Sequence, residues 1–185
     1  DNIVTAGNRN SWGFRIGGGR NFLAVDNAVR VSFHKLIRMN DGPVEYVYVK
    51  GGRWMREATL TAGGLAINDA FAQLGDLGTD EVYVHDTEVH LLSPEPVSFG
   101  MSNVPSQSGK RWEARRIAWF ARGASVVSDA VLGAYASSCP SGATCDYGLG
   151  THTYAYDASI AFPADPWRSP PTIANDDPDA LPVAP

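Results

Sequence analysis

Residues 44–60 read VEYVYVKGGRWMREATL, two runs of strand-forming residues separated by a pair of glycines. The first run is rich in Val and Tyr, which favour strands. A two-residue Gly-Gly link accepts the positive φ angles of a type I′ turn, and that turn joins adjacent antiparallel strands. Residues 29–34 alternate between apolar and polar before turn-forming residues at 40–43. The pattern therefore predicts a three-stranded antiparallel meander across residues 29–60.

Other segments predict more strands and little helix. Alternation or short apolar runs indicate strands at residues 12–16, 21–25, 81–92, 97–101 and 151–162. The spacing i, i+3, i+4, i+7 predicts a short helix ending at Gly75, with an apolar stripe formed by Ile67, Ala70, Phe71 and Leu74. Residues 111–123 fit either class, with helix favoured, and 125–137 could continue that helix or form a strand. The fold class that follows is mainly β: an antiparallel β-sandwich, of which a jelly roll is one form, with one or two short helices and an extended C-terminal arm.

Composition divides the chain after Phe162. Residues 163–185 hold seven of the twelve prolines and four aspartates, and such a segment cannot bury a core of its own. We expect one β-rich domain over residues 1–162, followed by a Pro/Asp-rich arm or tail over 163–185. We detect no internal repeat and no apolar run long enough to span a membrane. The 44% hydrophobic and 19% charged content is typical of a soluble globular protein.

Two cysteines, Cys139 and Cys145, enclose the short sequence Pro-Ser-Gly-Ala-Thr. A disulfide closes such a loop easily, and disulfides persist mainly outside the reducing cytosol. The pair predicts a disulfide and an extracellular, cell-surface or virion protein. Since residue 1 is Asp, we expect export or processing from a precursor.

Charge is segregated along the chain, although the net charge is only −5. Residues 1–60 carry +4, 61–109 carry −7 without any Lys or Arg, 110–122 carry +4 and 123–185 carry −6. These blocks could pair within the fold. Alternatively, basic and acidic faces could meet between copies of the protein, because complementary potentials fix register and steer association.

The basic block also contains aromatic residues, a combination that can stack bases and hold phosphates. The candidate binding residues are Arg111, Trp112, Arg115, Arg116, Trp119 and Arg122. A nucleic-acid-binding domain is usually basic as a whole. The acidic balance of this chain argues against that partner.

The best catalytic candidates are Asp86, Glu88 and His90. In a regular strand these alternate residues share one face. Two carboxylates and an imidazole could supply an acid–base pair for glycoside cleavage, with each carboxylate raising the proton affinity of the other. The same lettering also fits a solvated strand face. We expect no cofactor and no metal.

We therefore expect a non-enzymatic structural or adhesion subunit of a capsid, pilus, tail or surface layer. It would assemble with copies of itself or with other structural subunits, through complementary charged faces and the C-terminal arm. The alternative is a secreted glycan-active β-sandwich, either an enzyme that uses Asp86, Glu88 and His90 or a lectin-like binding module.

Overall fold

The structure is a computed structural model of the chain. It describes residues 3–6, 14–16, 19–31, 37–39, 44–56, 61–62, 65–66, 70–74, 81–92, 94, 96–100, 109–137, 139 and 141–160. The predicted arm at 163–185 lies outside the described residues.

The regular secondary structure of the described residues is β-strand, apart from one α-helix. The elements are β1 (Ile3–Ala6), β2 (Phe14–Ile16), β3 (Gly19–Val25), β4 (Ala28–Val31), β5 (Ile37–Met39), β6 (Val44–Lys50), β7 (Arg53–Arg56), β8 (Thr61–Ala62), β9 (Leu65–Ala66), β10 (Ala70–Leu74), β11 (Glu81–His85), β12 (Glu88–Leu91), β13 (Ser98–Gly100), β14 (Arg111–Arg115), β15 (Ala118–Ala121), α1 (Asp129–Ser137), β16 (Thr144–Asp146) and β17 (Thr153–Tyr156).

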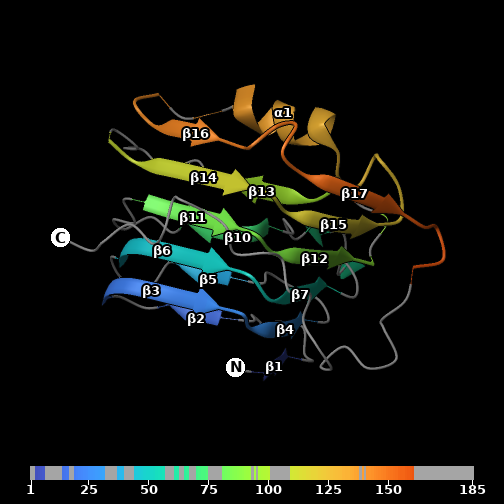
Figure 1. Ribbon diagram of the computed structural model, residues 1–185, viewed down its shortest axis with the longest axis horizontal. Helices are drawn as coiled ribbons and strands as arrows, with labels where there is room; N and C mark the ends of the chain where they lie inside the picture. The colour runs from blue at the N-terminus through green and yellow to red at the C-terminus, as the bar shows by residue number, and fades with distance from the viewer. Residues whose placement is uncertain are drawn as a thin grey trace.

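These strands form a parallel β-solenoid. A six-stranded sheet has the order β1-β4-β7-β12-β15-β17, a five-stranded sheet the order β16-β14-β11-β6-β3, and a four-stranded sheet the order β13-β10-β5-β2. Each full rung gives one strand to each sheet in turn, as β5, β6 and β7 do, and the rungs stack (Figure 1). Among the described strands, only the short pair β8 and β9 is antiparallel.

The prediction of an antiparallel sandwich is therefore wrong, and the Gly-Gly link shows why. Gly51 and Gly52 do have positive φ angles, 64° and 74°. They turn the chain around a corner, from the five-stranded to the six-stranded sheet, instead of reversing it. Consequently β6 pairs with β3 and β11, and β7 pairs with β4 and β12. Period-two alternation is the same in both arrangements, so the pattern of single strands did not distinguish them.

The same corner recurs in each full rung. Asp26, Asp86 and Arg116 occupy it with φ angles of 51°, 52° and 51°. Backbone hydrogen bonds continue through the corners, for example from Arg53 N to the Asn27 carbonyl at 2.9 Å. The chain thus has a structural repeat, which the expectation of no repeat missed. Its corner residues at 26, 51, 86 and 116 are separated by 25, 35 and 30 residues, and this irregular spacing hid it.

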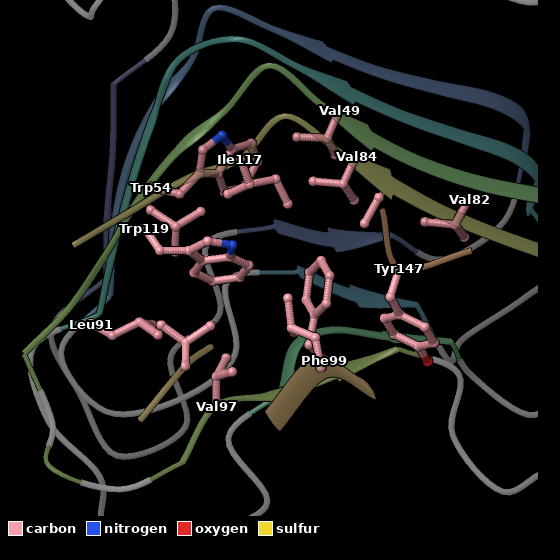
Figure 2. Close-up of a cluster of buried hydrophobic side chains, with 14 of the residues drawn as sticks. Val49, Trp54, Val82, Val84, Leu91, Val97, Phe99, Ile117, Trp119 and Tyr147 are labelled. Atoms are coloured by element: carbon pink, nitrogen blue, oxygen red, sulfur yellow. The ribbon is translucent and has the colours of Figure 1, made fainter. Parts of the chain in front are cut away.

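Inward-facing side chains fill the solenoid. The fully buried side chains include Trp54, Trp112, Trp119 and Phe99. Figure 2 shows Phe99 projecting between Trp119 and Tyr147, and its ring meets that of Trp119 edge-on at 5.4 Å between centroids. Burying each large apolar side chain contributes about 1.5–3 kcal/mol. The core therefore holds the rungs together.

Both helix predictions before residue 125 are wrong. Residues 70–74 form β10, and residues 111–115 and 118–121 form β14 and β15. Pairing with neighbouring rungs determined the secondary structure of these segments, because tertiary context overrides propensity. It outweighed the apparent helical stripe at residues 67–74 and the helix-favouring alanines at 114 and 118.

Helix α1 lies beside the last strands of the stack (Figure 1). It lies within residues 125–137, whose sequence fitted either a helix or a strand. Ser128 precedes it and caps it, because its Oγ accepts a hydrogen bond from Val131 N at 3.4 Å. Leu132 is buried in the core, and Tyr135 Oη donates to the Val97 carbonyl at 2.7 Å. Solenoids require such terminal caps, because the last rung would otherwise expose its core.

The predicted disulfide between Cys139 and Cys145 is confirmed, with 5.9 Å between Cα atoms. It ties the segment after α1 to β16, so it fastens the capped end of the stack. No helix in the described part of the chain is long and apolar enough to cross a membrane.

Candidate functional site

Asp86 lies at a corner and not within a strand. Strand β11 ends at His85, and the left-handed backbone at Asp86 removes it from the expected row of side chains. Its carboxylate is buried and accepts two hydrogen bonds from Arg116, Nε to Oδ1 at 2.7 Å and Nη2 to Oδ2 at 3.2 Å. Such a two-point contact fixes both side chains. Asp86 therefore joins its rung to the next one.

Glu88 and His90 do share the outward face of β12. His90 Nε2 contacts Glu88 Oε1, and Arg53 Nε on the neighbouring β7 donates to the same oxygen at 2.5 Å. The His90 ring stacks on Phe120 of β15, with 4.4 Å between centroids and 4° between planes. The cluster thus extends across three adjacent strands.

The surroundings of Glu88 determine its charge. Burial opposes ionisation, but the hydrogen bonds from His90 and Arg53 outweigh it and hold the pKa of Glu88 below its usual value. The expectation that neighbouring carboxylates would raise proton affinity is wrong for this residue. At neutral pH Glu88 is ionised and paired with Arg53 and His90, which does not suit a proton donor.

A second ionic cluster lies on the outward face of the five-stranded sheet. His85 Nε2 is 3.2 Å from Glu113 Oε1, and Arg111 Nη2 donates to Glu113 Oε2 at 2.6 Å. Arg115 Nη2 donates to Asp146 Oδ2 at 2.9 Å. Burial raises the pKa of Asp146, but the hydrogen bonds from Arg115 and Gly148 N–H lower it more, so its net pKa is below the usual value.

The charge blocks are therefore neighbours in space. Arg53 of the first basic block pairs with Glu88 of the first acidic block, and Asp86 of that block pairs with Arg116. Arg115 then pairs with Asp146 of the last block. Stacking of the rungs places opposite charges from different blocks side by side.

The candidate binding residues of the basic block do not form one surface. Trp112 and Trp119 face inward and are fully buried, so neither can stack on a base. Arg111, Arg115 and Arg116 face outward and are held in the ion pairs above. Arg122 is exposed. Period-two alternation places the aromatic and basic members on opposite sides of the sheet.

Within the described residues, no group of three or more His, Cys, Asp or Glu side chains is arranged to hold a metal ion.

His152 forms two hydrogen bonds that hold neighbouring segments together. Its Nδ1 accepts a hydrogen bond from Ile117 N at 3.1 Å, and its Nε2 donates to the Tyr147 carbonyl at 2.7 Å. Burial lowers the pKa of His152, which favours the neutral ring that this pairing requires.

One feature of the outer surface was missed at the level of sequence. Tyr48 and Met55 face outward in their strands, yet they are 4% and 0% exposed. The available signal was the unbroken run Val47-Tyr48-Val49 and the apolar Met55 next to Trp54, where a half-buried strand would alternate.

Comparison of the chain with protein-family models gives no match. Comparison with curated proteins and with solved structures gives no match either.

Proposed function

We propose that this chain is a non-enzymatic structural or adhesion subunit that acts outside the cytosol and assembles with copies of itself. The observation that carries the proposal is that the ionisable side chains considered for catalysis form ion pairs within the stack. Asp86 and Glu88, the two carboxylates best placed for chemistry, are both paired with arginines of neighbouring rungs. Their role in holding the stack accounts for their burial and positions.

The architecture supports the same proposal. A solenoid gains a continuous core from every added rung and makes a rigid, elongated body with extended outer faces. The disulfide beside the capped end supports a location in an oxidising compartment. Because ion pairs between all four charge blocks form within the chain, we assign contact between copies to the C-terminal arm and to charges that remain exposed.

A glycan-cleaving enzyme would need a protonated acid near neutral pH. Glu88 is held ionised, and Asp86 is separated from it by the corner. We therefore do not extend the proposal to catalysis.

The proposal is tested by mass photometry and negative-stain microscopy of the oxidised full chain over a wide range of protein concentration. We expect discrete oligomers or filaments whose share grows with concentration. A monomer under all of these conditions would overturn self-assembly.

A further inference from the structure

Strand β3 lies at one edge of the five-stranded sheet, where it pairs in parallel with β6. Among the described strands, none pairs with β3 on its other side. The six-stranded sheet extends one strand further at this end of the stack, because β1 pairs with β4, the strand that follows β3 (Figure 1). In the described part of the chain, the rung that contains β1 therefore has no strand beside β3.

The backbone of β3 presents hydrogen-bonding groups at this edge. Asp26 N, just after the strand, donates to the Lys50 carbonyl at 2.9 Å, so this N–H points toward β6. Backbone groups of successive strand residues point to alternate sides of the strand. Those of Asn21, Leu23 and Val25 therefore point away from β6. Such a row of donors and acceptors is a template for pairing with another strand.

The side chains of β3 favour pairing as well. Leu23 and Val25 are 54% and 44% exposed, and Phe22 is half-buried against the core. The sequence from Asn21 to Val25 contains neither charge nor proline, which are the usual protection of an edge strand. At the opposite edge of this sheet, β16 has only three residues, and one of them is the charged Asp146. Strand β3, with seven residues, is the edge suited to a partner strand.

We propose that the edge of β3 binds an extended strand of another protein chain, which runs parallel to β3. Parallel pairing continues the ladder that joins β3, β6 and β11. The side chains of the added strand that lie beside Phe22 and Ala24 face the core and are apolar, because a shift by one residue would turn them to the outside. Backbone hydrogen bonds supply the affinity, and the alternate side chains supply the selectivity. The inference does not depend on self-assembly, since it concerns one strand and not a whole second copy.

A synthetic peptide with the sequence of β6, VEYVYVK, is a suitable probe, because β3 already pairs with this sequence on its other side. In the chain, the backbone groups of Val47, Val49 and Gly51 face the next rung, as the bond from Gly51 N to the His85 carbonyl at 3.1 Å shows. In a peptide bound beside β3 in the same orientation, the N–H groups at positions 47 and 49 face β3. Those at positions 46 and 48 face away from it.

Two N-methylated peptides separate these edges. One carries N-methyl groups at positions 47 and 49, and its matched control carries them at 46 and 48. We measure binding of each labelled peptide to the oxidised full chain by fluorescence anisotropy. We expect saturable binding of the control, and binding about 30-fold weaker for the other peptide, because it loses two hydrogen bonds to β3. Equal affinities, or no binding of either peptide, would overturn the proposal.

Variants of the protein test the same contact from the side of β3. Leu23→Pro removes an N–H that points away from β6, and an edge strand tolerates proline at such a position. Leu23→Ala is the matched control, because it shortens the side chain and keeps the N–H. We expect the control peptide to bind Leu23→Pro about five-fold more weakly than Leu23→Ala, with circular dichroism showing that both variants are folded. Equal affinities for the two variants would overturn strand pairing, and mass photometry reports self-assembly separately.

Discussion

The corner at Gly52 gives the sharpest test of the solenoid. A Cβ atom at this position would lie 2.2 Å from the Asn27 carbonyl oxygen and 2.6 Å from Asn27 N, which are backbone atoms of the adjacent rung. Gly52→Ala therefore forces the two rungs apart locally. It also places a side chain at a φ of 74°, in the left-handed region.

The expected loss follows from these two effects. The left-handed backbone costs about 1–2 kcal/mol for a residue with a Cβ. Separation of the rungs weakens the bonds from Arg53 N to the Asn27 carbonyl and from Glu88 N to the Gly52 carbonyl, each worth about 1 kcal/mol. Gly52→Ala should lower the free energy of unfolding by about 3 to 4 kcal/mol.

Gly109→Ala is the matched control. Gly109 has a φ of 79°, but a Cβ there would meet nothing within 4 Å. Only the backbone term applies, so we expect a loss of about 1–2 kcal/mol. The measurement is urea unfolding followed by circular dichroism. Equal losses for the two variants would refute the close stacking of rungs at the corner.

Other predictions concern the ion pairs, the disulfide and pH. Glu88→Gln should lower the free energy of unfolding by about 2 kcal/mol, because it removes the counter-charge of Arg53 and weakens the hydrogen bonds of the Glu88 carboxylate with Arg53 and His90. Glu45→Gln, which removes an exposed pair, should cost less than about 1 kcal/mol; a larger loss for Glu45→Gln than for Glu88→Gln would contradict this ranking. Replacement of both Cys139 and Cys145 by Ser should cost about 2 kcal/mol by loop entropy, seen as a lower denaturation midpoint; an unchanged midpoint would exclude that contribution. The folded pKa of His152 is lowered, so the unfolded chain takes up the proton first, and stability should fall as pH drops below about 6.5. His152→Gln should flatten this part of the pH profile, and a profile identical to that of the unmodified chain would assign the pH dependence to other groups.

Part of the candidate site was accessible from sequence. Glu88 and His90 lie two residues apart in a strand, and period-two geometry was sufficient to place them on one face. Arg53, which completes their cluster, is 35 residues away from Glu88, and no local rule connects the two. Asp86 was misplaced because a left-handed backbone at a non-glycine residue is uncommon and has no clear signature in the pattern.

The order of the charge blocks along the chain is related to the fold. Basic and acidic segments that alternate along the chain meet when rungs stack, as the pair of Arg116 with Asp86 shows. At the level of sequence, pairing between blocks and contact between copies were equally open. Only the stacking of the strands showed which charges meet.

Sequence alone determined the properties that depend on near neighbours. The strand character of residues 44–50, the positive φ angles at Gly51 and Gly52, and the closure of the loop between Cys139 and Cys145 are all local, because each depends on residues a few positions apart. Tertiary structure decided which strands pair, and in which direction. Those hydrogen bonds join residues about 25 to 35 positions apart, such as Val47 and Val82, and a backbone group bonds equally well to a strand of any sequence. What selects the partner is burial of Trp54, Trp119 and their neighbours in one continuous core, a property of the whole stack and not of any single strand.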